Sequence, residues 1–228
     1  MNTTQVEQAR FNMIEQQIRP WNVLDLDILQ LLEVVRREEF VPVACRRLAF
    51  SDTEIPLPSN DSKIYGEAML SPKVEARLLQ AAAVKKHETV LEIGTGSGYM
   101  AALLSYKARH VVTVEINADL KIFADKNLRA YGITNVEVIE GNGAQGWETD
   151  KNTTYDVIVI SGSLSTLPEI FLKQLKVGGR IIAIIGDAPV MTAQKITRTS
   201  ETTYATENLF ETFAKPLREA APHSKFKF

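Results

Sequence analysis

The chain has 228 residues, of which 45% are hydrophobic and 24% are charged, a balance typical of a globular protein with one large domain or one domain and a small appendage. Its 26 Lys and Arg against 28 Asp and Glu give a formal net charge of −2, so we expect neither nucleic acid nor an anionic membrane as a partner. The single cysteine, Cys45, excludes an internal disulfide and is expected to be a small buried side chain, and the scattered His87, His110 and His223 predict no metal site.

The first residues predict two helices and no targeting segment. A basic start followed by an apolar stretch is missing, and no apolar run is long enough to span a bilayer, so we expect a cytoplasmic protein. Apolar residues at helical spacing predict helices over residues 6–18 and 25–36, and Pro20 stops the first of them.

The next segment is predicted to consist of extended chain and turns until a third helix begins. Prolines exclude a long helix between residues 40 and 58, and a polar loop is expected over residues 59–62. Ser71 and Pro72 then have the residue types of a helix start, with Ser71 as the capping residue and Pro72 in the first turn.

From residue 87 onward, short apolar runs alternate with helical segments. Such apolar strands, separated by helices, are typical of a parallel sheet that is covered on both faces. Two further strands joined by a polar turn predict an antiparallel hairpin at the C-terminal edge. The predicted strands are 89–93, 111–114, 136–139, 155–160, 180–185, 190–198 and 202–213, and the predicted helices are 98–107, 118–131 and 168–175.

A glycine-rich turn follows the first of these strands. It has the spacing Gly-x-Gly-x-Gly, whereas the dinucleotide fingerprint Gly-x-Gly-x-x-Gly requires a glycine where this chain has Tyr99. Glycines allow a ligand to lie directly against the backbone, and the following helix directs its free amides toward that ligand. Glu92, just before the turn, would repel a pyrophosphate but suits a cationic amino-acid group. The turn therefore favours S-adenosylmethionine, which has an ammonium, a sulfonium and no phosphate.

The ends of the next strands supply the remaining candidate binding residues. Glu115 can accept both hydroxyls of a ribose, which either cofactor class contains. A tight turn around Asn142 can lie beside an adenine ring, and Ser161 ends the fourth strand of the series. The predicted cofactor-binding residues are Glu92, Gly94, Thr95, Gly96, Ser97, Gly98, Tyr99, Glu115, Ile116, Gly141, Asn142, Gly143 and Ser161.

These residues together resemble the protein-L-isoaspartate (D-aspartate) O-methyltransferase family. The resemblance covers most of the chain and includes residues 13–18, 35–42, 52–58, 90–99 and 172–179. It implies a Rossmann-like methyltransferase fold, S-adenosylmethionine as cofactor, and methyl transfer to the carboxylate of isoaspartyl residues in damaged proteins. It also implies an N-terminal substrate-side region, residues 1–84, packed on a cofactor-binding core, residues 85–228.

The chain departs from the family on the acceptor side. In the family's Gln-Thr-Ile-Ser-x-Pro segment, Ala68 replaces the threonine and Leu70 replaces the serine, and Glu67 adds a negative charge. Ser71 is the one nearby hydroxyl and the candidate catalytic residue, with helix capping as its alternative role. Asn142 replaces the aspartate of the family's Gly-Asp-Gly turn.

Three hypotheses follow for function. The first is a methyltransferase of this family with an altered acceptor pocket, acting on isoaspartyl peptides or on a different carboxylate or hydroxyl. The second is a protein that binds the cofactor without repair activity. The third, a nicotinamide-dependent oxidoreductase, is disfavoured by Tyr99 and Glu92.

Overall fold

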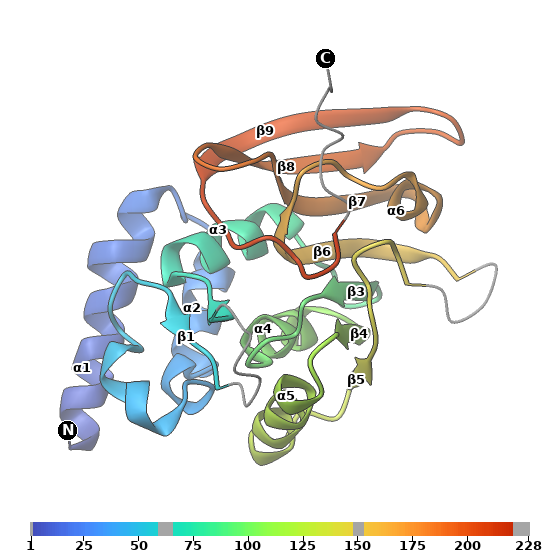
Figure 1. Cartoon of the computed structure of the whole chain (residues 1–228). Helices are drawn as coiled ribbons and strands as arrows, with labels where there is room; N and C mark the ends of the chain where they lie inside the picture. Colours follow the sequence, from blue (N-terminus) through green and yellow to red (C-terminus); the bar gives the residue numbers. More distant parts are fainter. Residues whose placement is uncertain (1, 59–65, 148–152, 221–228) are drawn as a thin grey trace.

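A seven-stranded sheet forms the centre of the computed structural model, which describes residues 2–58, 66–147 and 153–220 (Figure 1). Its strand order is β5-β4-β3-β6-β7-β8-β9. The first five of these strands pair in parallel, and β7, β8 and β9 pair antiparallel, which confirms the predicted C-terminal hairpin. The strands are β3 (Thr89–Ile93), β4 (His110–Glu115), β5 (Val136–Glu140), β6 (Tyr155–Leu164), β7 (Leu175–Ile185), β8 (Met191–Arg198) and β9 (Tyr204–Thr212).

The chain order places a ligand crevice at the carboxyl ends of β3 and β6. From β3 the chain continues to β4 on one side, and it later returns to β6 on the other side. The loops after β3 and β6 therefore run in opposite directions, and ligands of open α/β sheets bind where such loops diverge. The alternating side chains of each strand supply two apolar faces, with Val90 on one face and Leu91 on the other.

Helices cover both faces of the sheet, but unequally. One face packs against α3 (Pro72–Ala82), α4 (Tyr99–Lys107) and α5 (Ala118–Ala130). The other face packs against the short α6 (Glu169–Lys173) through Phe171, which is fully buried. Figure 1 shows α6 at the far side of the sheet from α4 and α5.

The N-terminal region adds helices and short turns to the first face. It contains α1 (Thr3–Met13), α2 (Leu26–Val34) and the two-stranded antiparallel pair β1 (Ile55–Pro56) and β2 (Ala68–Met69). Its apolar residues, from Met13 onward, belong to the same hydrophobic cluster as Val90 of β3. The division into residues 1–84 and 85–228 stays a prediction.

The N-terminal elements differ in detail from the expected ones. The α-helical part of the first helix begins three residues earlier than expected, because Asn2 caps it by accepting a hydrogen bond from the amide of Gln5. It ends at Met13, and a π-helical turn (Ile14–Ile18) and a 3-10 turn (Arg19–Trp21) complete the segment. The chain between residues 40 and 58 contains a 3-10 turn, Val43–Leu48, and no long helix, in agreement with the extended chain and turns expected there. The predicted loop 59–62 lies outside the described residues.

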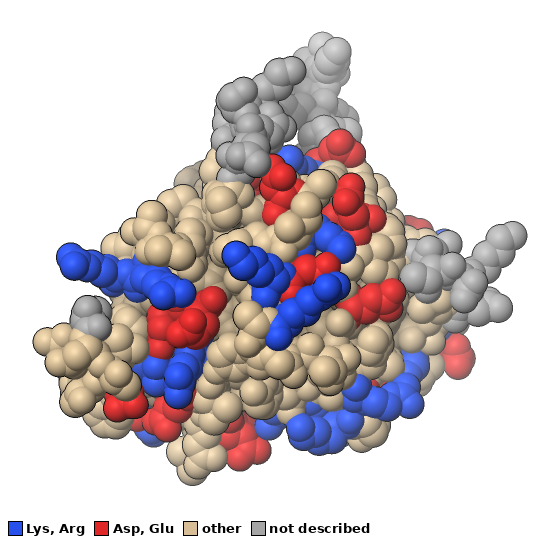
Figure 2. Space-filling model, turned by 90° about the horizontal axis from the view of Figure 1, so that it is seen from below, with Lys and Arg blue, Asp and Glu red and all other residues tan. Residues whose placement is uncertain are grey.

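The surface carries charges of both signs (Figure 2), and Cys45 is more exposed than expected. Lys, Arg, Asp and Glu are interspersed on the face seen in Figure 2. Cys45 is half-buried rather than buried, because it lies in the exposed 3-10 turn beside Val43, and it packs against the core from one side only. Among the described residues, no cluster of His, Cys, Asp and Glu could hold a metal ion, and no helix has the length and apolarity needed to cross a membrane.

Candidate active site

The glycine turn after β3 has a backbone conformation that side chains rarely adopt. Gly94, Gly96 and Gly98 have φ angles of +91°, +54° and +83°. The Gly94 amide donates to the carbonyl of Val114 in β4, and the Gly98 amide donates to the carbonyl of Thr95, so the turn is fixed at both ends. The turn therefore leaves bare backbone at the carboxyl end of β3, as its spacing predicts.

Glu115 fastens this turn to the end of β4. Its Oε2 accepts from the Gly96 amide at 2.9 Å, and its Oε1 accepts from the Asn117 amide at 3.0 Å. Burial raises the pKa of Glu115, while these two amides oppose that rise. Each carboxylate oxygen has two lone pairs, so both oxygens can still accept a ribose hydroxyl.

Glu92 lies beneath the turn and is fully buried. Its Oε1 accepts from the hydroxyl of Ser161 at 2.9 Å and its Oε2 accepts from the hydroxyl of Thr113 at 2.7 Å. Burial raises the pKa of Glu92 to about 8, although both hydroxyls favour the ionised form. A buried carboxylate of this kind gains most from a cationic ligand, which would favour its ionised form.

A crevice opens above the turn, and its empty space, with the adjoining open solvent included, is about 680 Å³. Its apolar walls include Ile93, Val114 and Leu120. Eight predicted cofactor-binding residues line this crevice: Gly94, Gly96, Glu115, Ile116, Gly141, Asn142, Gly143 and Ser161.

A second, smaller hollow lies on the other side of the turn, with about 300 Å³ of empty space when the adjoining open solvent is included. It shares four lining residues with the crevice, so the two hollows meet at the turn: Ala68, Gly94, Gly96 and Ser161. Four further predicted residues line this hollow: Glu92, Thr95, Ser97 and Tyr99. Gly98 lines neither hollow. A Cβ on Gly98 would lie 3.2 Å from Leu128, so close packing of α5 accounts for this glycine.

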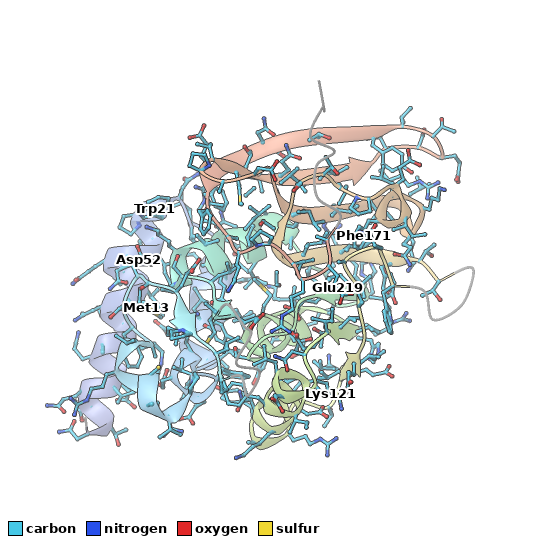
Figure 3. The ribbon with its side chains drawn as sticks, in the orientation of Figure 1. Met13, Trp21, Asp52, Lys121, Phe171 and Glu219 are labelled. Carbon is cyan, nitrogen blue, oxygen red and sulfur yellow. The ribbon has the colours of Figure 1, made fainter. Side chains whose placement is uncertain are left out.

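Asn142 is held in place by two hydrogen bonds. Its Oδ1 accepts from the Ala144 amide at 2.9 Å, and its Nδ2 donates to Oε2 of Glu219 at 2.8 Å. Figure 3 labels Glu219 between Phe171 of α6 and Lys121 of α5, near the middle of the molecule. The amide group of Asn142 therefore orders the wall of the crevice that was predicted for an adenine ring.

The segment after β9, residues 214–219, was missed by sequence reasoning. In Figure 1 it crosses in front of β6 toward β3. The Ser163 amide donates to the carbonyl of Lys215, and the Leu217 amide donates to the carbonyl of Ser163, so the segment is tied to the end of β6. Lys215, Pro216, Leu217 and Arg218 line the crevice as a result.

Arg218 forms an ion pair with Glu67, the first residue of the acceptor-side segment 67–72. Its Nε donates to Oε1 of Glu67 at 2.5 Å. Although partial burial opposes ionisation, this hydrogen bond lowers the pKa of Glu67. The negative charge of Glu67, which the sequence placed unfavourably for a carboxylate acceptor, is thus compensated by a cation in the crevice.

Ser71 and Lys73 lie away from both hollows. Ser71 occupies the N-cap position of α3, but its side chain makes no capping hydrogen bond. Lys73 forms an ion pair with Asp52 at 2.6 Å and lies 3.9 Å from the centre of the Trp21 ring. Figure 3 places Trp21 and Asp52 together on the N-terminal side of the molecule. Neither Ser71 nor Lys73 is among the residues that line the crevice or the hollow.

The arrangement fits S-adenosylmethionine better than a dinucleotide. Tyr99, 1% exposed, fills the position where a dinucleotide turn has its third glycine. Buried Glu92 beneath the turn suits an ammonium and disfavours a pyrophosphate. Glu115 and the glycine-lined crevice suit an adenosine.

Comparisons with known proteins identify one family. The family model for protein-L-isoaspartate(D-aspartate) O-methyltransferase matches residues 8–219. A protein-L-isoaspartate O-methyltransferase of Synechococcus sp. (strain JA-2-3B'a(2-13)) is 36% identical over 180 residues, which are 79% of this chain and 70% of the relative.

Two solved structures share the fold. A protein-L-isoaspartate O-methyltransferase, 26% identical, superposes with a TM-score of 0.74 over 92% of this chain, which spans 65% of that protein. A Plasmodium falciparum structure with the same family name, in complex with S-adenosyl-L-homocysteine, is 20% identical with a TM-score of 0.76 over 92% of this chain and 98% of that one. The predicted Rossmann-like methyltransferase fold is thereby confirmed.

Proposed function

This chain belongs to the protein-L-isoaspartate(D-aspartate) O-methyltransferase family, and from that premise we propose that it methylates isoaspartyl residues in damaged proteins or peptides. It is an S-adenosylmethionine-dependent methyltransferase, like the relatives that it matches. The observation that carries the proposal is the crevice between β3, β4 and β6, whose bare glycine turn lies above buried Glu92 and beside buried Glu115, and whose lining includes the cations Lys215 and Arg218.

The cofactor-binding part of the proposal uses the residues around the glycine turn. Glu115 would accept the ribose hydroxyls, and the wall formed by Ile116 and Asn142 would hold the adenine. Glu92 would attract the amino-acid end, because its buried carboxylate lacks a cationic partner among the described residues. When bound, the cofactor supplies a methyl group on a sulfonium, which an acceptor carboxylate can take directly with a thioether as the leaving group.

The acceptor part of the proposal uses Lys215 and Arg218. Both line the crevice near Ala68, where the aligned family segment has a hydroxyl that this chain lacks. Cations near the crevice attract a carboxylate and keep it ionised, which is the reactive form. An ionised carboxylate needs no general base, so the work of these residues is to orient the acceptor and to exclude water. Such positioning can contribute about 7–11 kcal/mol to a bimolecular step.

Protein repair and a cytoplasmic location are parts of this proposal. The acceptor would be an isoaspartyl-containing protein or peptide. The lone Cys45, which leaves no internal disulfide, is compatible with a reducing compartment.

The experiment that tests the proposal is methyl transfer from radiolabelled S-adenosylmethionine to an isoaspartyl peptide and to the matched aspartyl peptide. We expect base-labile label on the isoaspartyl peptide alone. Equal labelling of both peptides would assign a different acceptor. Cofactor binding without labelling of either peptide would contradict the repair activity.

A further inference from the structure

The small hollow on the inner side of the glycine turn contains two buried carboxylates from different elements. Glu92 belongs to β3 and is 0% exposed, and Glu75 belongs to α3 and is 5% exposed. Both line this hollow, which meets the adenosyl crevice at Gly94 and Gly96. Sequence reasoning found Glu92 but not Glu75, because Glu75 lies on a helix 17 positions earlier in the chain.

Glu75 has one cationic neighbour, Arg37, which also donates a hydrogen bond to the acceptor-side segment. Arg37 donates from Nη1 to Oε2 of Glu75 and from Nη2 to the carbonyl of Leu70 at 2.8 Å. The guanidinium also lies 5.4 Å from the centre of the Tyr99 ring. Among the described residues, the Glu75 carboxylate accepts no other hydrogen bond. Arg37 therefore holds Glu75 in position and leaves part of its carboxylate for the hollow.

The charges around the hollow do not balance when Glu75 and Glu92 are ionised. Two carboxylates, Glu75 and Glu92, face one guanidinium, and Glu115 at the end of β4 adds a further negative charge nearby. The other groups packed against them, from β4, β6 and α4, are the neutral hydroxyls of Thr113, Ser161 and Tyr99. Burial raises the pKa of Glu75 to about 7, against the attraction of Arg37. A cation bound in the hollow would relieve this imbalance.

We infer that Glu75 is a second carboxylate of the cofactor site, which binds the ammonium of the cofactor's amino-acid end together with Glu92. The inference rests on the proposed function, because it takes the adenosine to lie in the larger crevice beside Glu115. From there, the amino-acid end reaches the hollow past Gly94 and Gly96, the residues that both spaces share. The hollow includes the turn before α4, whose first amides suit the carboxylate of the same amino-acid end.

Binding of two ligands can distinguish contact between Glu75 and the ammonium from a purely structural role of Glu75. S-adenosylhomocysteine carries the amino-acid end, whereas 5′-methylthioadenosine has the same adenosine and a thioether but no amino-acid end. Calorimetry would measure the affinity of both ligands for the wild type and for E75Q, which keeps the shape of the side chain and its acceptor for Arg37. We expect E75Q to lower the affinity for S-adenosylhomocysteine by about ten- to a hundredfold, because a charged hydrogen bond is lost. The affinity for 5′-methylthioadenosine should stay unchanged.

A matched control is E88Q. Glu88 is also buried and paired with an arginine, at 2.7 Å and 2.8 Å from Arg180, but it precedes β3 at the end remote from the crevice. Its substitution should change neither affinity. If E75Q does not fold, the double variant R37M/E75M removes both buried charges together, an exchange that proteins often tolerate, and it allows the same comparison.

The other outcomes would contradict either this inference or the proposed function. If E75Q binds S-adenosylhomocysteine like the wild type, Glu75 does not contact the ammonium. If E75Q lowers the affinity for both ligands equally, Glu75 acts only through the packing of α3, and the inference is again wrong. If the wild type binds neither ligand, the proposed function itself fails.

Discussion

The amide of Gly96 donates to the Glu115 carboxylate over 2.9 Å, and this hydrogen bond joins the turn after β3 to the end of the neighbouring strand β4. Both residues line the crevice. The surface for an adenosyl ligand is therefore assembled from two strand ends that parallel pairing brings together, with Ile93 opposite Val114 in the register. Because Glu115 fixes the turn before any ligand arrives, the site is largely preformed.

The first prediction concerns Gly96. The variant G96V should lose cofactor binding, because a Cβ at this position already lies 3.2 Å from Leu57, so the side chain would enter the small hollow where it meets the crevice. The matched control is G178V. Gly178 also has a positive φ, +81°, but no atom lies within 4 Å of a Cβ there. Both variants carry a similar backbone strain of about 1–3 kcal/mol, so calorimetry with S-adenosylhomocysteine isolates the effect of the crevice. Normal binding by G96V would refute the proposed site.

The second prediction separates Arg218 from its partner Glu67. The variant R218Q should lower kcat/KM for an isoaspartyl peptide by about tenfold or more, because the acceptor carboxylate loses a cation. The variant E67Q should leave kcat/KM unchanged or raise it, because Arg218 then loses its competing carboxylate. Steady-state kinetics at saturating cofactor measure both. A similar loss in both variants would show that the ion pair matters only for structure.

The third prediction concerns Ser71, the hydroxyl first expected to serve the acceptor. Because its side chain lines neither hollow and makes no capping hydrogen bond, S71A should keep kcat/KM within about twofold and lower stability by less than about 0.5 kcal/mol. Peptide kinetics and thermal unfolding measure these effects. A tenfold loss of activity with normal cofactor affinity would restore Ser71 to the acceptor site.

The fourth prediction is a fall in stability of the ligand-free protein as pH rises. The pKa values of Glu75 and Glu92 are raised to about 7 and about 8, above the ordinary value of 4.5. At pH values between the ordinary and the raised pKa values, the folded protein binds more protons than the unfolded chain. The free energy of unfolding therefore decreases as the pH rises, by at most about 1.4 kcal/mol per pH unit for each group. Thermal unfolding between about pH 5 and pH 8 measures this slope.

The control for the pH effect is E92Q, which should flatten the slope because the group whose pKa is raised to about 8 no longer titrates. Glu88 and Asp156 have lowered pKa values, so their stabilising effect is lost only when the pH falls below the ordinary pKa values of these groups. They therefore act outside the range from about pH 5 to pH 8. Saturating S-adenosylhomocysteine should also flatten the slope, since its ammonium favours the ionised carboxylates. A stability that rises through this range would contradict the assignment of buried, protonated carboxylates.

Local sequence patterns predicted the sheet and the turn, because both depend on short-range preferences. The run Thr89 to Ile93 is apolar enough for a buried strand, and the glycines that follow it adopt positive φ angles. The acidic residues at the ends of β3 and β4 follow from the same pattern, since parallel strands end at one edge of the sheet.

Long-range contacts account for what the sequence did not predict. The segment 214–219 reaches the crevice only because Ser163 binds it from 51 or more residues earlier in the chain. Glu75 reaches the hollow only through the packing of α3, and its ion pair with Arg37 spans 38 positions. The placement of Ser71 outside the hollows likewise depends on the orientation of α3 as a whole.

The most direct test of the proposed cofactor site is a crystal structure of the protein with S-adenosylhomocysteine. We expect the ribose on Glu115, the adenine beside Ile116 and Asn142, and the ammonium between Glu75 and Glu92. A ligand bound elsewhere, or a crevice closed by Leu217 in saturating ligand, would contradict it.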